Sequence, residues 1–324
     1  MKRKDGLTIR DRNRERKVKE AFSKRACDIG LDREVASKIA ELLISDSVKA
    51  QRRQTRQDLV GRKALVIGGS GRMGSWVCRR LSNRGASVKV WDPRGRLDGY
   101  ENIRDLAPPA READIIVIAS PLGVASDELR LVLKAKPVGL VFDVCSVKAH
   151  MAKQLRGAAR SGVKVASAHP MFGPNIPTPE GRNVIVCDCG SSEGVALLKK
   201  LFSSSGAKVV EMSLEEHDRL MVYVLGLPHM SSILFAATLA SSGESAQSLS
   251  RVQGPSFEKM LAASRELSKE SVRVYHDIQA LNPNTRRLFL KFVNSVKFFR
   301  KASIQKDPSA FRKLMESNKK YLEA

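Results

Sequence analysis

The spacing of hydrophobic positions changes twice along the chain, and each change begins a new segment. Residues 1–57 carry apolar side chains at helical spacing, in one stripe over 18–29 and a second over 35–48. Gly30 separates the stripes, and Asp32 is placed to cap the second helix. Two helices of this size do not bury a core by themselves. The segment therefore predicts two helices whose partner helix is missing from the chain or supplied by another subunit.

From Ala64 the pattern becomes short apolar runs separated by polar or helical stretches, which predicts parallel strands buried on both faces. The runs lie at 64–69, 87–92, 114–120, 139–146, 163–170, 183–190 and 208–213. After Ser213 helical spacing returns. The helices are predicted at about 214–242, 255–276, 281–302 and 308–322. We expect an α/β protein with three parts: a helical segment at 1–57, a doubly wound parallel sheet at 58–212 and an all-α part at 213–324.

Composition narrows the possible partners. The 324 residues carry a formal net charge of +23, which suits nucleic acid and suits small anionic substrates equally well. No apolar run approaches the ~18 residues of a membrane span, and no apolar signal segment follows the basic start, so we expect a cytoplasmic protein with no membrane partner. The five cysteines lack C-x-x-C spacing, so neither a disulfide framework nor a metal site is expected.

A glycine motif indicates a dinucleotide site. The stretch "ALVIGGSGRMGSW" places Gly69, Gly71 and Gly74 in G-x-G-x-x-G order, directly after a strand and at the start of a helix. Gly69 would permit the tight turn, and Gly71 would let the backbone approach a pyrophosphate. Gly74 would let helix and strand pack closely, and the helix N-terminus would hold the phosphates.

The residues after the next strand bear on which dinucleotide is bound. Asp92 ends that strand, where a carboxylate accepts hydrogen bonds from the ribose hydroxyls of NAD. Arg94 and Arg96 follow at once and would receive the 2′-phosphate of NADP instead. NAD is favoured over NADP because of Asp92. The predicted cofactor contacts are Gly69, Gly71, Arg72, Met73, Gly74, Asp92, Ser120, Pro121 and Lys148.

Three histidines stand in informative contexts. His169 in "SAHPMFGP" lies at the end of a strand that would run toward the cofactor crevice. In "FDVCSVK", Ser146 and Lys148 lie at the carboxyl end of another strand, where open α/β sheets bind ligands. His217 in "EEHDRLM" and His229 in "GLPHMSS" are twelve residues apart, too far for a helical metal pair.

Together these pieces resemble the prephenate dehydrogenase (TyrA) family. The matching stretches are "GGSGRMG", Ser120-Pro121, "DVCSVK", "HPMFGP", "EHD" and "LPH", in order from residue 62 to about 302. The resemblance implies a Rossmann domain, a helical dimerisation domain and a homodimer. It also implies NAD-dependent oxidative decarboxylation of prephenate to 4-hydroxyphenylpyruvate; arogenate is an open alternative substrate. A basic nucleic-acid-binding protein with a vestigial nucleotide fold is the alternative from another class, disfavoured because the charge is spread over all three segments.

The resemblance also implies roles for single residues. His169 would bind the C4 hydroxyl and take its proton, and Ser146 would orient His169 or that hydroxyl. Arg265 in "LAASREL" would meet the ring carboxylate, although one residue is inserted between it and the following "YHDI". His229 would line the same pocket, and His217 would orient structure at the domain junction.

The first segment resembles a second enzyme. "KRKDGLTIRDRNRER" and "LLISDSVKAQRRQ" look like the second and third helices of an AroQ-type chorismate mutase. The pocket residues matched are Lys2, Asp11, Arg14, Glu15, Ser47 and Gln51. The long first helix of that domain, with two more arginines, is absent. Three explanations are open: the true start of the chain lies upstream, the segment is a remnant used for dimerisation or regulation, or a partner chain supplies the missing helix.

Overall fold

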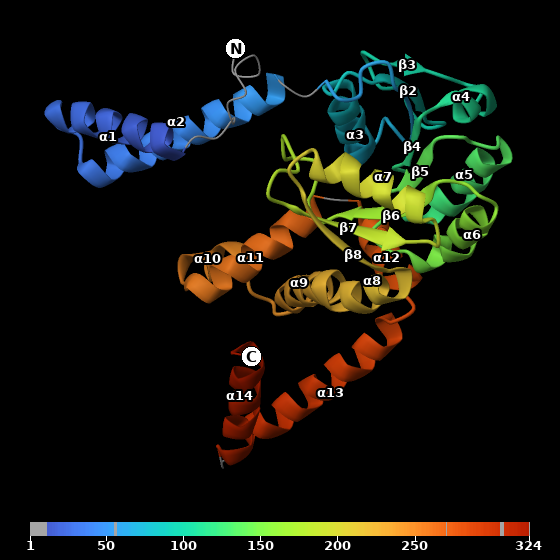
Figure 1. The fold of residues 1–324 in the computed structure, drawn as a ribbon. Helices are drawn as coiled ribbons and strands as arrows, with labels where there is room; N and C mark the ends of the chain where they lie inside the picture. The colour runs from blue at the N-terminus through green and yellow to red at the C-terminus, as the bar shows by residue number, and fades with distance from the viewer. Residues whose placement is uncertain (1–11, 55–56, 270, 305–307, 324) are drawn as a thin grey trace.

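The structure, a computed structural model, describes residues 12–54, 57–269, 271–304 and 308–323. Three parts follow one another along the chain: an N-terminal helical hairpin, a sheet covered by helices and a C-terminal group of helices (Figure 1). The α/β fold that the sequence predicts is confirmed.

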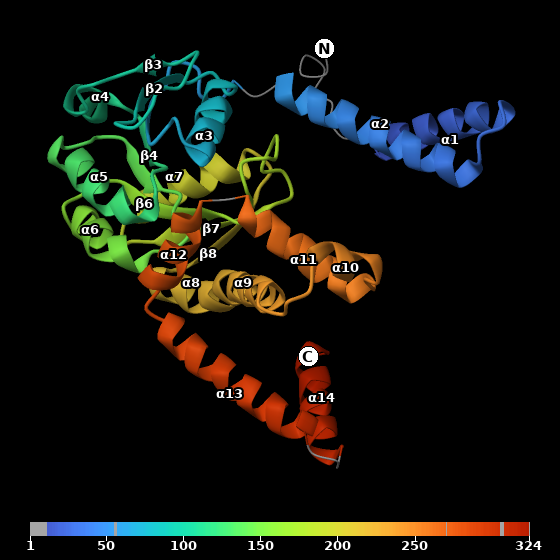
Figure 2. The ribbon, with the colours of Figure 1, turned by 180° about the vertical axis from the view of Figure 1, so that it is seen from behind.

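The N-terminal hairpin consists of α1 (Arg12–Asp28) and α2 (Arg33–Gln54). The predicted break and cap are both confirmed. Gly30 has φ +89°, and the Asp32 carboxylate accepts the backbone N–H of Glu34 at 2.8 Å and of Val35 at 3.1 Å. The hairpin stands away from the rest of the molecule in both views (Figures 1 and 2). Small side chains such as Ala36 are buried between the two helices, but many large apolar side chains are open to solvent, among them Leu42, which is 70% exposed.

The second part is built on one eight-stranded sheet of order β3-β2-β1-β4-β5-β6-β7-β8. The strands are β1 (Lys63–Ile67), β2 (Ser87–Trp91), β3 (Glu101–Asn102), β4 (Ile115–Ile118), β5 (Leu140–Asp143), β6 (Val165–Pro170), β7 (Asn183–Asp188) and β8 (Lys208–Ser213). Neighbouring strands are parallel, as predicted, except β6 and β7. That pair is antiparallel because a loop joins the two strands without a crossover helix. The short β3 was not indicated by the hydrophobic pattern.

Helices cover both faces of this sheet. They are α3 (Arg72–Ser82), α4 (Ala107–Glu112), α5 (Leu122–Lys134), α6 (Ala149–Arg160) and α7 (Ser192–Ser203). Side chains alternate between the faces along each strand: in β1, Ala64 and Val66 pack with α3 and α7, whereas Leu65 and Ile67 pack with α4, α5 and α6. Burial on both faces explains why the central strands β1, β4, β5, β6 and β7 appear in the sequence as continuous apolar runs.

The third part contains α8 (Leu214–Met221), a π-helical turn η1 (Val222–Gly226), α9 (Leu227–Ala240), α10 (Ala246–Arg251), α11 (Pro255–Ser268), α12 (Val272–Leu281), α13 (Thr285–Ile304) and α14 (Ser309–Leu322). The single helix predicted at 255–276 is two, α11 and α12, and α10 was not predicted. Pro228 has no N–H for the preceding turn, which accounts for the π turn inside the predicted long helix. In both views α13 and α14 extend from the body of the molecule (Figures 1 and 2).

One helical stretch departs from the sequence expectation about membranes. Leu214–Ala240, 27 residues long, has the length and apolar composition of a membrane span, with 28% of its most apolar window buried. Length and composition do not distinguish a span from a helix covered by other protein surfaces. The expectation that no apolar run approaches span length is therefore wrong, while a membrane location does not follow.

Candidate active site

Polar segments gather where parallel strands end. The glycine loop follows β1, Ser120 follows β4, residues 144–148 follow β5, and His169 lies near the end of β6. Since β1, β4, β5 and β6 are parallel neighbours, these carboxyl ends meet at one edge of the sheet.

The glycine loop is shaped by close backbone contacts. Gly68 has φ +75°, and a Cβ there would lie 2.6 Å from the Ser120 hydroxyl oxygen. The motif predicts the tight turn at Gly69, and the structure corrects this to Gly68, because Gly69 instead fits against Val90. The packing role of Gly74 is supported: a Cβ there would lie 2.1 Å from the carbonyl oxygen of Gly68.

The first turn of α3 has donors for an anion. Gly71 is the N-cap of α3 and makes no side-chain cap hydrogen bond, and a helix N-terminus of this kind is a binding site for anions. The Ser120 side chain is buried against the glycine loop, close to Gly68. A helix N-terminus with no side-chain cap and a cradle with no room for a Cβ fit a dinucleotide.

Asp92 connects the end of β2 to the glycine loop. Its carboxylate accepts the backbone N–H of Ser70 at 3.1 Å and the Ser70 hydroxyl, and its other oxygen accepts the backbone N–H of Arg94 at 3.0 Å. Asp92 is therefore fixed beside the loop, whereas the side chains of Arg94 and Arg96 are exposed.

The segment after β6 is attached to the helix that follows the glycine loop. Trp76 in α3 donates its indole N–H to the carbonyl oxygen of Ile176 at 2.7 Å, and its ring packs edge-to-face on Phe172. The Arg72 guanidinium donates to the Asn175 side chain at 3.3 Å. These contacts hold the "HPMFGP" stretch beside the predicted phosphate site.

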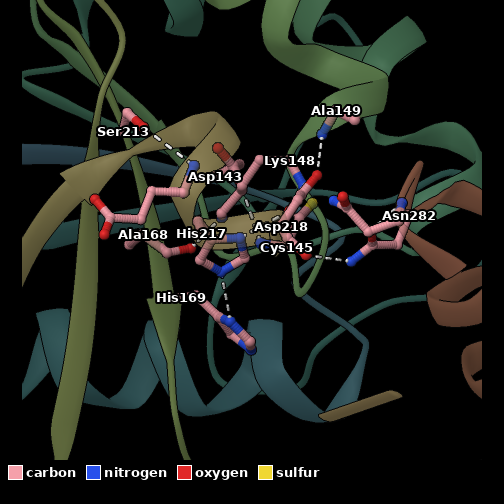
Figure 3. A network of polar contacts seen from close by, with 12 residues as sticks. Asp143, Cys145, Lys148, Ala149, Ala168, His169, Ser213, His217, Asp218 and Asn282 are labelled. Atoms are coloured by element: carbon pink, nitrogen blue, oxygen red, sulfur yellow. Dashed lines mark hydrogen bonds and ion pairs between the residues drawn. The ribbon is translucent and has the colours of Figure 1, made fainter. Parts of the chain in front are cut away.

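His169 lies in a buried line of polar groups (Figure 3). Its Nδ1 is 2.9 Å from Nε2 of His217, whose Nδ1 is 2.8 Å from Oδ1 of Asp218. Burial, then His217 and Lys148, hold the pKa of His169 well below its ordinary value, so its imidazole is neutral at pH 7. The resemblance implies that Ser146 orients His169 or the substrate hydroxyl. Ser146 is half-buried in the segment after β5, and among the described residues the hydrogen bond at Nδ1 of His169 is made by His217.

Lys148 is turned into the protein interior. Its ammonium is fully buried and donates to Asp143 at 2.8 Å and to the carbonyl oxygen of Ala168 at 2.6 Å. Its backbone N–H, with that of Ala149, donates to the Asp218 carboxylate. The sequence predicts a cofactor contact for Lys148; the structure instead gives its ammonium a role in joining β5 to β6.

The helical part contributes the remaining predicted residues. His229 in α9 packs edge-to-face on Tyr275, and burial lowers its pKa. Arg265 is exposed on α11, next to Ser264, whose hydroxyl donates to the carbonyl oxygen of Ser232 in α9. In the part of the chain that the structure describes, no hydrogen bond or ion pair joins Arg265 to His229.

Two carboxylates of the site were missed from the sequence. Asp143 ends β5 within "FDVCSVK", and Asp218 follows His217 in "EHD". An acid at the end of a buried strand and an adjacent His–Asp pair are the signals that could have found them. The resemblance gave His217 a role at the domain junction but did not predict its contact with His169.

The mutase-like residues are only partly described. Two of them, Lys2 and Asp11, lie outside the described residues. The other four have positions on the hairpin: Arg14 and Glu15 in α1, Ser47 and Gln51 in α2.

Comparison with known proteins identifies the chain. Residues 98–211 match the family described as "Prephenate dehydrogenase, nucleotide-binding domain", and residues 213–317 match "Prephenate dehydrogenase, dimerization domain". A 4-amino-4-deoxyprephenate dehydrogenase from Streptomyces pristinaespiralis is 30% identical over 232 residues, which cover 68% of this chain and 78% of that protein. The chain belongs to the prephenate dehydrogenase family.

Another relative and a crystal structure are also similar to this member of the prephenate dehydrogenase family. A "Probable arogenate/prephenate dehydrogenase" from Methanocaldococcus jannaschii is 28% identical over 267 residues, 79% of this chain and 60% of the relative, so the chain spans less than two thirds of that protein's length. A crystal structure of prephenate dehydrogenase from A. aeolicus, in complex with hydroxyphenyl propionate and NAD+, has TM-score 0.66 at 20% identity, covering 81% of this chain and 98% of that one. This likeness shows that the fold is shared.

Proposed function

We propose that this chain oxidises prephenate with NAD, releasing CO2 and 4-hydroxyphenylpyruvate. The observation that carries the proposal is His169, a buried neutral imidazole at the carboxyl end of β6, with Nδ1 engaged by His217 and Nε2 in no hydrogen bond within the described residues. A neutral imidazole with one unengaged nitrogen, at the same edge of the sheet as the glycine loop, suits proton removal coupled to hydride loss.

Support for NAD comes from the start of α3 and from Asp92. The uncapped first turn of α3 would hold the pyrophosphate, and the carboxylate of Asp92 would accept hydrogen bonds from the ribose hydroxyls. A carboxylate at that position repels the 2′-phosphate of NADP, which supports NAD as the cofactor. Bound NAD supplies the acceptor for a hydride.

In the proposed reaction, Nε2 of His169 takes the proton of the C4 hydroxyl while the hydride leaves C4. The ring carboxylate then departs as CO2, the electron pair of the broken C–C bond completes the aromatic ring, and the C4 oxygen, now a phenolate, takes the proton back from Nε2 of His169. Aromatisation drives this loss, so the protein needs no acid for it. The roles of the chain are to position C4, to exclude water and to accept one proton.

The substrate is a dianion and requires a cation. We assign Arg265 to its ring carboxylate, in a bidentate pair, and His229 to the wall of the same pocket. The exposure of Arg265 on α11 supports the assignment, because its guanidinium is open to an incoming anion.

We further propose that the chain acts as a cytoplasmic homodimer. The helical part that matches a dimerization domain exposes large apolar side chains along α13, among them Leu290, 61% exposed, and Phe299, 51% exposed. A second copy that covers this helix would remove that apolar surface from water.

The N-terminal hairpin supports a weaker proposal, that it forms part of a chorismate mutase pocket. The ion pair between Lys19 and Glu41 shows the register of α1 against α2, in which the first turn of α1 is level with the C-terminal half of α2. The backbones of Arg14 and Ser47 thus lie toward the same end of the hairpin. A Claisen rearrangement needs only such cations and donors around the substrate. Disappearance of chorismate in the presence of the purified chain would test it.

The dehydrogenase proposal is tested by following NADH at saturating NAD with prephenate, arogenate or 4-amino-4-deoxyprephenate. We expect the highest kcat/KM with prephenate, and a lower value when NADP replaces NAD. His169→Asn should lower kcat by about 10²–10⁴-fold while NAD binding is kept. The matched control is His276→Asn, since His276 also contacts a neighbouring aspartate but its side chain is 72% exposed. A wild-type chain that reduces NAD with none of the three substrates would contradict the proposal.

A further inference from the structure

His169 ends a chain of hydrogen bonds that begins at a carboxylate in the helical part of the protein. Asp218 contacts His217 at 2.8 Å, and His217 contacts His169 at 2.9 Å. The exposed fractions of the three residues are 2%, 0% and 5%. In Figure 3 the ring of His217 lies between the other two groups, and a dashed line joins the two rings. Water therefore does not compete for these bonds.

The direction of each bond follows from the carboxylate end. The backbone N–H groups of Lys148 and Ala149 donate to the two oxygens of Asp218 at 2.8 to 3.1 Å. Both oxygens already act as acceptors, so Nδ1 of His217 donates its proton to Asp218, and Nε2 of the same neutral ring has only a lone pair. His169 must then donate from its own Nδ1. Its Nε2 is left without a proton.

The surrounding charges favour one proton on each ring. The Lys148 ammonium is fully buried and is held by Asp143 and the carbonyl oxygen of Ala168. Burial and this cation lower the pKa of His169, and burial is the largest cause that lowers the pKa of His217. Neither ring becomes an imidazolium at pH 7. Each ring therefore carries a single proton, and each has one nitrogen that donates and one that accepts.

We propose that His217, anchored by Asp218, is the positioning residue that holds His169 in the Nδ1–H tautomer and so keeps Nε2 free to accept the substrate proton. Without a fixed acceptor at Nδ1, an imidazole exchanges between its two tautomers, and one of them carries a proton on Nε2 and cannot act as a base. The inference rests on the proposed function in one respect, the identity of Nε2 as the accepting atom.

The arrangement makes the base in the sheet depend on the helical part. His217 and Asp218 lie in α8, within the residues that match the dimerization domain, whereas His169 lies within those that match the nucleotide-binding domain. Asn282, which follows α12, donates its amide to the carbonyl oxygen of Asp218 at 2.9 Å, and the Ser213 hydroxyl caps α8. The tautomer of His169 is therefore set only when the two parts are docked.

Two substitutions of His217 separate positioning from support of the fold. In His217→Gln the amide oxygen can occupy the place of Nε2 and still accept from His169. In His217→Asn the shorter amide reaches Asp218 but leaves His169 without an acceptor. We expect His217→Asn to lower kcat by about 10²–10⁴-fold, as loss of base positioning does in other enzymes, and His217→Gln to retain at least tenfold more activity. Thermal melting of both variants and the affinity for NAD are measured alongside.

The tautomer itself is read from nitrogen-15 spectra of histidine-labelled protein, with His169→Asn to assign the signals. In the wild type we expect His169 to be protonated on Nδ1 only, and in His217→Asn a mixture of tautomers. Protonation of Nε2 in the wild type, or equal losses of kcat in both variants with an unchanged His169 spectrum, would overturn the proposal. The spectra need no substrate, so a wild-type chain that is inactive on prephenate would count against the proposed function and leave this result standing.

Discussion

The glycine loop and the histidine network lie at the same edge of the sheet but are built in opposite ways. The loop is one contiguous stretch that would bind its ligand through backbone amides. Its shape depends on glycines, because a Cβ at a position such as Gly74 would clash with the backbone. The network joins side chains from β5, β6, the start of α6 and α8, and its members are buried. An added Cβ should therefore distort the glycine loop, and the loss of a charge should destabilise the histidine network.

The largest effect should come from removing a charge in the network. Burial alone lowers the pKa of Lys148, but Asp143 raises it and the net pKa lies above its ordinary value, so the ammonium stays charged. Lys148→Met leaves the Asp143 carboxylate buried without its cation, which should reduce the free energy of unfolding by about 3–5 kcal/mol. Urea denaturation of the variant measures this loss.

The matched control for that loss is Lys199→Met. Lys199 also pairs with an acid, Glu211, but both side chains are 46% exposed, and a pair of that kind contributes at most about 1 kcal/mol. Equal destabilisation by the two variants would show that burial does not distinguish the two ion pairs and would break the comparison.

The next effect should come from adding one carbon to the loop. In Gly74→Ala the new Cβ meets the carbonyl oxygen of Gly68, a backbone atom that cannot rotate away, so the loop must shift. Strain of this kind costs about 1–3 kcal/mol, and we expect KM for NAD to rise about tenfold or more. Steady-state kinetics with varied NAD measure it.

Gly157→Ala provides the control, because Gly157 lies inside α6 and a Cβ there meets nothing within 4 Å. That change should leave KM for NAD unchanged and stabilise the protein by up to about 1 kcal/mol, since alanine is the better helix former. An unchanged KM in Gly74→Ala would mean that the loop does not hold the cofactor.

The same contrast explains how far the sequence predicts the structure. Strands buried on both faces leave continuous apolar runs, so seven of the eight strands were predicted, and only the two-residue β3 was not. The glycine spacing predicted the loop, but the tight turn fell on Gly68, because φ depends on how the loop meets Ser120 and not on motif spacing alone. Apolar runs and glycine spacing therefore predict the strands and the loop, whose form depends mainly on the local backbone.

The histidine network shows where such prediction ends. "SAHPMFGP" pointed to His169, but its partner His217 is 48 residues away, and only the docking of α8 brings the rings together. Lys148 was predicted to face the cofactor because its position at a strand end is typical of ligand sites. Its side chain turns inward because Asp143, five residues earlier, offers a buried carboxylate. Side-chain direction of this kind is decided by tertiary contacts.

The smallest expected effect is a difference in pH dependence between catalysis, which uses the histidine network, and NAD binding, which uses the glycine loop. The site base is a buried histidine whose pKa is lowered, so it stays neutral as the pH falls below the ordinary histidine value of about 6.5 and is lost only further into acid. A histidine of ordinary pKa would lose about fourfold of its neutral form between pH 8 and pH 6. We expect kcat/KM for the substrate at saturating NAD to fall by less than that over the same range. NAD binding, which depends on backbone amides, should not change, and an acid limb centred near pH 6.5 in kcat/KM would show that His169 is open to water rather than enclosed by the network.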